Sequence, residues 1–227
     1  MPKRVLIVDE SPLVRAGLKA VLATEPDLVI CAEAGTRRET LQLTGELRPN
    51  LVITDLTLPD SAGLDLIRGL RARVPEVRIL VCSLYDERLF AGRVVRAGAL
   101  GFVDKRESIE QVIAAVHRVL ADQVYLSQAM VERVLAGLAG RRPYPCDLVD
   151  QLSDREFEVF GLIGQGLATR LIAQRLRLIV KTIESHREKI KYKLDLPDAA
   201  ALTRCAVQWS LDPTLVNRRF PDRPDPG

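Results

Sequence analysis

A short apolar run, Leu51–Thr54, meets a carboxylate at Asp55 and is stopped by Pro59. A run this short, apolar and partly β-branched is typical of a strand buried on both faces of a parallel sheet. Three other segments repeat the arrangement, and they are Val5–Val8 before Asp9 and Glu10, Ile79–Cys82 before Ser83, and Gly101–Val103 before Lys105. Open parallel sheets build their sites at the carboxyl ends of the strands. We therefore expect these polar groups to meet at one edge of the sheet.

Each of these polar groups alone is ordinary, because an Asp after a strand often serves a turn or a helix cap and a lone Lys is often solvated. Together they are informative. Clustered carboxylates are the ligands that Mg²⁺ prefers, with water and phosphate completing its shell. A carboxylate beside such an ion attacks phosphorus, while a hydroxyl and an ammonium bind the transferred oxygens. Asp55 is the expected nucleophile, and Ser83 and Lys105 are the expected phosphoryl-binding groups.

In this order, the acidic pair, Asp55, Ser83 and Lys105 resemble the CheY-like receiver domain of two-component response regulators. The resemblance covers residues 3–121 and implies a flavodoxin-like fold with Mg²⁺ as the cofactor of phosphorylation. It further implies a set of metal ligands, namely Glu10 and Asp55 directly, Asp9 through bound water, and the backbone carbonyl of Thr57.

The same resemblance assigns a switch. Ser83 moves toward the phosphoryl oxygens and draws the aromatic ring of Phe102 inward. Two residues depart from the family pattern. Glu10 stands where a second aspartate is more common, and its longer arm shifts the metal carboxylate. Leu84 stands where a small residue often follows the switch serine, which narrows the access of a phosphodonor.

The composition fits a soluble chain of one or two domains, with 227 residues, 47% apolar and 28% charged. No apolar run approaches a membrane span, and Met1–Arg4 leads into the first strand without a signal-peptide core, so we expect a cytoplasmic protein. The four cysteines are scattered without a CxxC pair, which predicts reduced structural thiols, and they are Cys31, Cys82, Cys146 and Cys205.

The first half alternates strand and helix, which predicts a doubly wound, five-stranded parallel sheet in a receiver domain at 1–121. The strands are expected at 5–8, 28–34, 51–54, 78–82 and 101–103, and the helices at 12–23, 38–47, 63–71, 86–97 and 108–120. In the last helix the apolar spacing predicts one buried stripe, made of Ile109, Val112, Ile113, Val116 and Leu120.

A connector is expected at 122–150, with an apolar helix at 129–138 and a boundary marked by glycine and proline near 140–145. Residues 151–211 are expected to be all helical. The helices are predicted at 153–164, 170–176, 180–194 and 199–211, the first opened by a capping box of Ser153 and Glu156. The proline-rich tail at 212–227 is expected to be disordered.

A short helix, a tight turn and a longer basic helix form a helix-turn-helix pattern. The net charge of +3 says little, and residues 1–121 carry 17 basic against 16 acidic groups. Residues 170–193, in contrast, carry eight basic groups against two acidic ones. An isolated basic run is more often a solvated helix, but the preceding helix and turn favour a nucleic-acid partner.

Four segments of this region resemble the LuxR-type helix-turn-helix, and they are residues 152–156, 164–170, 172–173 and 181–186. With the receiver pattern, the whole chain resembles a response regulator of the NarL/FixJ type. Here too there are departures. Ile179 replaces a serine that caps the recognition helix, which removes about 1 kcal/mol of local stability, and Leu171 replaces a glutamate.

On the third helix of this region, Ile183, Ile190 and Leu194 share one face and are expected in the core. The opposite face, with Lys181, Ser185, Glu188 and Tyr192, is expected to enter the major groove of double-stranded DNA. Phosphate contacts are assigned to Lys181, Thr182 and Lys189, and base contacts to Glu184, Ser185 and Glu188.

Alternatives remain for two of the side chains. Glu188 either contacts a base or is an exposed helix charge that pairs with Lys191 or Tyr192, and the two readings have equal weight. His186 contacts a phosphate or simply packs, and the resemblance favours the phosphate. His117 is expected to be plain surface.

These features favour a DNA-binding regulator that a sensor histidine kinase phosphorylates on Asp55. The resemblance to the family further implies that residues 198–211 form the homodimer contact. One alternative is a regulator that binds DNA without phosphorylation. A second is a metal-dependent phosphatase, but that chemistry in the haloacid-dehalogenase type needs an aspartate where Thr57 stands, so we expect no enzyme.

Overall fold

A computed structural model describes residues 1–85, 87–128, 130–132, 149 and 151–211. The chain divides into two compact units, Met1–Val131 and Glu132–Gly227. The expected helix at 129–138 lies almost wholly outside the described residues, and the expected disordered tail lies entirely outside them. None of the helices in the described part of the chain has the length and apolarity needed to cross a bilayer.

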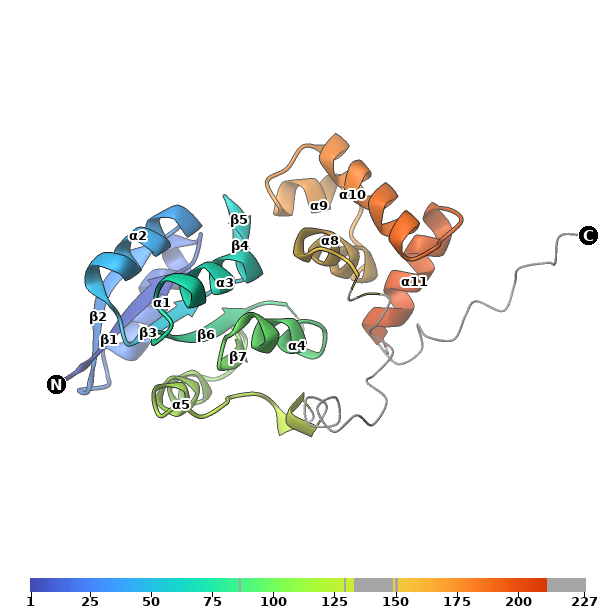
Figure 1. The fold of residues 1–227 in the computed structure, drawn as a ribbon. Coiled ribbons are helices and arrows are strands. Elements are labelled where there is room, and N and C mark those ends of the chain that lie inside the picture. Colours follow the sequence, from blue (N-terminus) through green and yellow to red (C-terminus); the bar gives the residue numbers. More distant parts are fainter. Residues whose placement is uncertain (86, 129, 133–148, 150, 212–227) are drawn as a thin grey trace, which may run out of the picture. The chain divides into compact units, whose positions relative to one another are not determined.

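The first unit is a five-stranded parallel sheet in the order β2-β1-β3-β6-β7, the flavodoxin-like arrangement that the strand–helix alternation predicts (Figure 1). Its strands are β1 (Lys3–Val8), β2 (Leu28–Ala34), β3 (Leu51–Thr54), β6 (Arg78–Ser83) and β7 (Gly101–Asp104). Its helices are α1 (Pro12–Leu22), α2 (Arg37–Leu47), α3 (Gly63–Arg73), α4 (Glu87–Ala97) and α5 (Ile109–Leu120).

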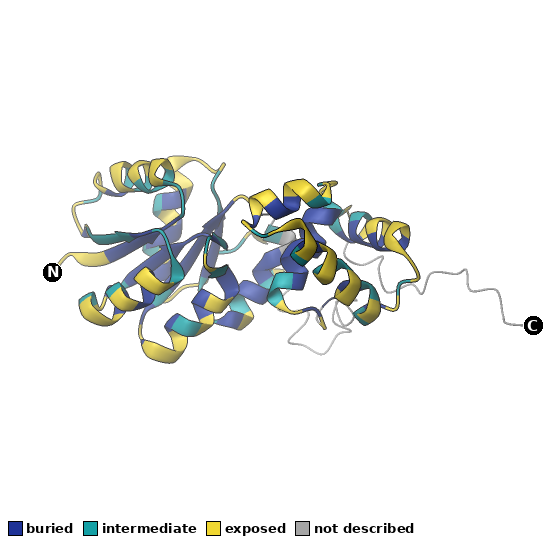
Figure 2. Ribbon diagram, turned by 90° about the horizontal axis from the view of Figure 1, so that it is seen from above, coloured by how far each residue is buried: buried dark blue, intermediate teal, exposed yellow. Residues whose placement is uncertain are grey.

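Helices cover both faces of the sheet, and its central strands are buried except at the amino ends of β1 and β6 (Figure 2). Alternate strand residues such as Val5, Ile53 and Leu80 form one core with α1 and α5. The residues between them, such as Leu6 and Val52, are also buried and face the other layer. Because both faces are covered, these strands read as continuous apolar runs in the sequence.

The structure corrects the sequence prediction at several positions of the first unit. Residues after Asp55 form a small antiparallel hairpin, β4 (Thr57–Leu58) with β5 (Ser61–Ala62), where only a loop was predicted. Helix α3 runs two residues past the predicted end. Ile109 is 55% exposed and is not part of the buried stripe. It is the first residue of α5, just after the Ser108 cap, where the helix has only begun to cover the sheet.

The edge of the sheet continues beyond β7. Tyr125 forms a bridge with Gly101, donates its N–H to the Leu100 carbonyl at 3.0 Å and accepts the Phe102 N–H at 2.9 Å. The first residues of the expected connector therefore pair with the receiver sheet.

The second unit contains four helices in its described part, close to the predicted spans. They are α8 (Asp154–Gly164), α9 (Thr169–Arg175), α10 (Val180–Lys193) and α11 (Ala199–Leu211). Ser153 and Glu156 form the predicted capping box at the start of α8. Trp209 of α11 packs in the core against Phe157 and Phe160, with ring centroids 5.2 and 5.4 Å away.

Three of the cysteines lie in the described residues, and all three are free thiols. Burial raises the pKa of Cys82 to about 12 and that of Cys205 to about 11, so both thiols stay protonated and unreactive. Cys31 is half-buried in β2. Cys146 lies outside the described residues.

Candidate phosphoacceptor site and nucleic-acid interface

The register of the sheet aligns the carboxyl ends of its central strands. Val8 pairs with Thr54, and Thr54 pairs with Val81, so the residues that follow these strands emerge at one edge. Ser83 ends β6 opposite Asp104 of β7, and Lys105 is the next residue. The topology thus brings together Asp9, Asp55, Ser83 and Lys105, which the sequence placed at a single site.

Both carboxylate oxygens of Asp55 accept hydrogen bonds. Oδ1 accepts the Ser83 hydroxyl at 2.6 Å and the Leu56 N–H at 2.6 Å, and Oδ2 accepts the Lys105 ammonium at 2.6 Å. The residue is only 8% exposed. Asp55 is thus a nearly buried carboxylate with a hydroxyl and an ammonium held directly against it.

Lys105 also reaches the second carboxylate of the site. Its Nζ lies 2.5 Å from Asp9 Oδ2, while Asp9 Oδ1 accepts the Ser11 N–H at 2.8 Å. Burial alone would lower the pKa of Lys105, but Asp55 and Asp9 outweigh burial and raise it, so the ammonium stays charged. One cation therefore faces two buried carboxylates.

The chain after Asp55 is held by a very close backbone contact. A Cβ on Gly63 would lie 2.4 Å from the Leu56 Cα and 2.7 Å from the Leu56 oxygen, and the Gly63 N–H donates to that same oxygen at 2.9 Å. Only glycine allows the first turn of α3 to lie this close to the residue that follows Asp55. Sequence reasoning did not identify this position.

The remaining predicted receiver residues lie around the same edge. Glu10 follows Asp9 and is half-buried, with its Oε2 out of contact with solvent, and Thr57 begins β4. The ring of Phe102 is buried in β7, whereas Leu84, directly after Ser83, is about half exposed. The donors in this group are hard carboxylate oxygens carrying more negative charge than Lys105 neutralises, which fits a divalent cation such as Mg²⁺.

In the second unit, α10 presents two distinct faces. Ile183, Ile190 and Leu194 are buried, as predicted. The residues expected to face the groove are exposed, and they are Lys181, Glu184, Ser185, Glu188, Lys189 and Tyr192. Thr182 is half-buried in the first turn. Ile179 occupies the N-cap position and makes no side-chain cap, as the sequence predicts.

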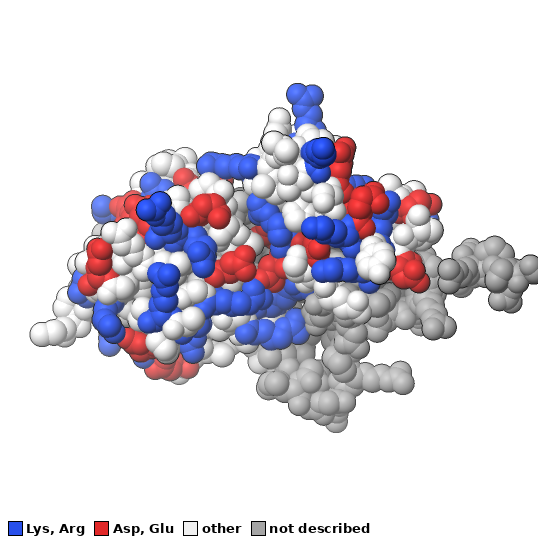
Figure 3. Space-filling view, turned by 45° about the horizontal axis from the view of Figure 1, so that its top comes forward, with Lys and Arg blue, Asp and Glu red and all other residues white. Residues whose placement is uncertain are grey.

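Ion pairs reduce the number of cations available on this helix. Lys191 pairs with Glu188 at 2.9 Å, one of the two alternatives considered for Glu188. Lys193 binds Glu156 of α8 at 2.7 Å and the Gln151 carbonyl at 3.2 Å, so it stabilises the fold of this unit. Figure 3 shows acidic side chains standing among the basic ones on the face drawn.

His186 is half-buried on α10. Burial, with smaller contributions from Lys189 and Arg155, lowers the pKa of its imidazole, so it is neutral at pH 7. A contact of His186 with phosphate is therefore that of a neutral N–H donor.

Arg155 is a further structural cation that sequence reasoning missed. It bonds Glu158 at 2.6 Å and the Leu176 carbonyl at 3.0 Å, and so joins α8 to the turn after α9. The spacing of three residues between Arg155 and Glu158 is a signal that the sequence does contain.

Comparison with known proteins agrees with both units. The model of the response regulator receiver domain matches residues 5–117, and the model of bacterial regulatory proteins of the luxR family matches residues 150–206. The transcriptional activator protein ExaE of Pseudomonas putida is 34% identical over 212 residues, which cover 91% of this chain and 97% of ExaE. The chain belongs to the NarL/FixJ-type response regulators.

Other relatives align with this response regulator over most of their length. The nitrate/nitrite response regulator protein NarL of Escherichia coli K12 is 30% identical, covering 86% of this chain and 90% of NarL. Among solved structures, RcsB of Salmonella enterica serovar Typhimurium, bound to the promoter rprA with a phosphomimetic, has a TM-score of 0.60 at 23% identity. That alignment covers 90% of this chain and 98% of RcsB, and it shows the shared fold. This response regulator is a transcription regulator with a receiver and a LuxR-type DNA-binding domain.

Proposed function

We propose that this response regulator is switched by phosphorylation of Asp55, with a sensor histidine kinase as phosphodonor. The observation that carries the proposal is the convergence of Ser83 and Lys105 on a buried Asp55 carboxylate. A carboxylate oxygen attacks the phosphorus atom, and the bond from phosphorus to the donor breaks. Lys105 and Ser83 are placed to bind the oxygens of the transferred group.

Mg²⁺ is the proposed cofactor. Asp55 and Glu10 would hold it directly, Asp9 through water, and the Thr57 carbonyl would complete the share of the protein. When bound, the ion neutralises charge on the transferred phosphoryl group. The role of this chain is to hold Asp55 in place through the Leu56 N–H and the Gly63 contact, and to keep Lys105 charged beside it.

The DNA contacts are proposed for the exposed face of α10. Lys181, Thr182 and Lys189 are assigned to phosphates, with His186 as a neutral donor, and Glu184 and Ser185 are assigned to base edges. Glu188 contacts a base only if it leaves Lys191. Homodimerisation through Asp198 and α11 is proposed to present two such helices to the two halves of a DNA site.

One observation favours regulation without phosphorylation as a second candidate. Ser83 already donates to Asp55, and the Phe102 ring is already buried, which is the inward arrangement expected of the switched receiver. In that reading the receiver is a dimerisation scaffold, and the state of Asp55 does not change DNA binding.

Acetyl phosphate with Mg²⁺, followed by intact-mass measurement, tests the proposal. We expect one phosphoryl adduct on the native chain and none on Asp55→Asn, which keeps the shape of the side chain. Binding to sequences selected from a random DNA pool, with and without phosphodonor, then separates the two candidates. An adduct that persists in Asp55→Asn refutes the assignment, and native binding that ignores an adduct on Asp55 favours the scaffold.

A further inference from the structure

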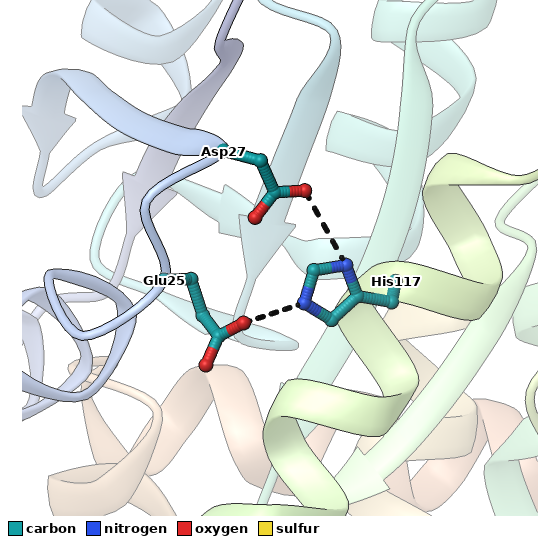
Figure 4. A group of neighbouring side chains, drawn as sticks. All are labelled: Glu25, Asp27 and His117. Carbon is teal, nitrogen blue, oxygen red and sulfur yellow. Dashed lines mark hydrogen bonds and ion pairs between the residues drawn. The ribbon is translucent and has the colours of Figure 1, made fainter.

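A mixed cluster of two carboxylates and one imidazole lies away from both proposed sites. His117 of α5 stands between Glu25 and Asp27, and each carboxylate approaches a different ring nitrogen (Figure 4). Glu25 Oε2 lies 2.9 Å from Nε2, and Asp27 Oδ2 lies 3.8 Å from Nδ1. Sequence reasoning expected His117 to be plain surface, whereas its side chain is 38% exposed and paired.

The cluster joins two segments that are distant in the sequence. Glu25 and Asp27 belong to the turn between α1 and β2, where the Leu28 N–H donates to the Glu25 carbonyl at 3.2 Å around Pro26. Lys3, the first residue of β1, donates its N–H to the Asp27 carbonyl at 2.7 Å. The backbone that carries both carboxylates is thus anchored at the amino ends of β1 and β2.

This location separates the cluster from Asp55. The phosphoacceptor lies at the carboxyl ends of the strands, and β1 spans six residues, so about 20 Å of strand divides the two edges. An ion held by the cluster therefore shares no ligand with the Mg²⁺ proposed at Asp55.

The chemistry of the three donors points to a borderline-soft metal. One ligand atom from each residue lies within 4.8 Å of the others. A tetrahedral ion with bonds of about 2.0–2.2 Å needs donors roughly 3.4 Å apart. The ion binds only one ring nitrogen of His117, so the carboxylate that lies at the other nitrogen must move around the ring to reach it. Asp27 is the most exposed of the three and has the freedom to move. An imidazole with two carboxylates suits Zn²⁺ better than Mg²⁺, which prefers oxygen donors alone.

We propose that Glu25, Asp27 and His117 form a site for a divalent transition-metal ion, with Zn²⁺ as the fitting example. Water completes the shell of the ion. Binding replaces the hydrogen bond between His117 and Glu25. The bound ion fastens α5 to the turn between α1 and β2.

The chain contains only two histidines, and this makes the test direct. The full-length protein, labelled with ¹⁵N in histidine, is titrated with zinc chloride under reducing conditions while the ring nitrogens are followed by NMR. We expect a saturable shift of the His117 nitrogens at one equivalent, with His186 unchanged. Glu25→Gln should weaken this binding by about tenfold or more. Asp55→Asn is the matched control, which should leave the titration unchanged.

Two results overturn the proposal. One is a His117 signal that does not respond to millimolar zinc. Zinc that binds only to cysteine thiols would give this same result. The other is a shift that survives unchanged when Glu25→Gln and Asp27→Asn are combined, which identifies a lone surface histidine. The amide spectrum of each variant shows whether the receiver remains folded.

Discussion

A serine at position 179 should restore a cap that α10 lacks. Ile179 already has the extended backbone of an N-cap residue, with φ −77° and ψ 150°, but its side chain accepts no hydrogen bond. A serine hydroxyl at this position accepts an N–H from the first turn of the helix, and such a cap contributes about 1 kcal/mol relative to alanine.

The loss of the isoleucine side chain sets the size of the net effect. Ile179 is 69% exposed, so roughly a third of its apolar surface is buried. Full burial of an isoleucine side chain stabilises a fold by roughly 2 kcal/mol, so this partial burial contributes about 0.7 kcal/mol. Ile179→Ala should therefore cost about 0.7 kcal/mol, and Ile179→Ser should gain about 0.3 kcal/mol. The difference between the two variants isolates the cap.

The fluorescence of Trp209 reports the unfolding of the DNA-binding unit alone. It is the only tryptophan of the chain, and it is buried between Phe157 and Phe160. Urea titration followed by its fluorescence should rank the serine variant about 1 kcal/mol above the alanine variant, with equal m-values. Ser153→Ala, which removes an existing cap from α8, is the control and should cost a similar amount. Equal stability of the two variants at 179, with a loss in the control, refutes the N-cap reasoning for α10.

Four further outcomes can be measured. Glu10→Gln should raise the Mg²⁺ concentration needed for phosphorylation by acetyl phosphate, and an unchanged titration contradicts a role for Glu10 as ligand. Lys181→Ala should reduce the magnitude of the salt slope of DNA binding by about one, without changing base preference, whereas Glu184→Ala should relax preference at one base pair by about 1–3 kcal/mol. If the two variants exchange these effects, the wrong face of α10 has been assigned to the groove. Gly63→Ala should slow phosphorylation and destabilise the receiver, because its Cβ meets the Leu56 backbone, and native rates argue against that contact. Acid should loosen the DNA-binding unit through Glu156: burial opposes its ionisation, but bonds from lysine and serine outweigh burial and lower its pKa. The carboxylate of Glu156 contributes its full stabilisation above the ordinary glutamate pKa of about 4.5, and this contribution is lost as the pH falls through the lower pKa of the folded state. Urea titrations across that pH range should show this loss in the native chain and not in Glu156→Gln.

The meeting of Asp9, Asp55, Ser83 and Lys105 was predictable because parallel pairing leaves few choices. Once the strands are recognised, their carboxyl ends must lie at one edge, and the polar residues that follow them must meet there. The buried face of α10 was equally predictable from the sequence, because helical periodicity places Ile183 and Ile190 together without any tertiary information.

Contacts between distant segments were not predictable in this way. Lys193 counted as a cation for DNA in the sequence, but it binds Glu156, a partner 37 residues away. His117 pairs with Glu25 across 92 residues, and neither position has a spacing that indicates the other. Ile109 matched the apolar period of α5 but is exposed. Periodicity predicts which face of a helix is apolar, but it does not predict at which residue the helix begins to pack on the sheet.

The state of Ser83 and Phe102 limits what phosphorylation can change in this chain. A modification shifts an equilibrium between two conformations only by the difference in its interactions with them. Ser83 already donates to Asp55, and Lys105 already bridges Asp9 and Asp55, so the inward arrangement is held together by the carboxylates themselves. A phosphoryl group on Asp55 would add oxygens for the same hydroxyl and ammonium to bind, where each now contacts one oxygen of Asp55. Its effect in this receiver would then be to stabilise an arrangement that the unmodified chain can already adopt, and the strength of regulation would depend on how often the unmodified chain leaves it.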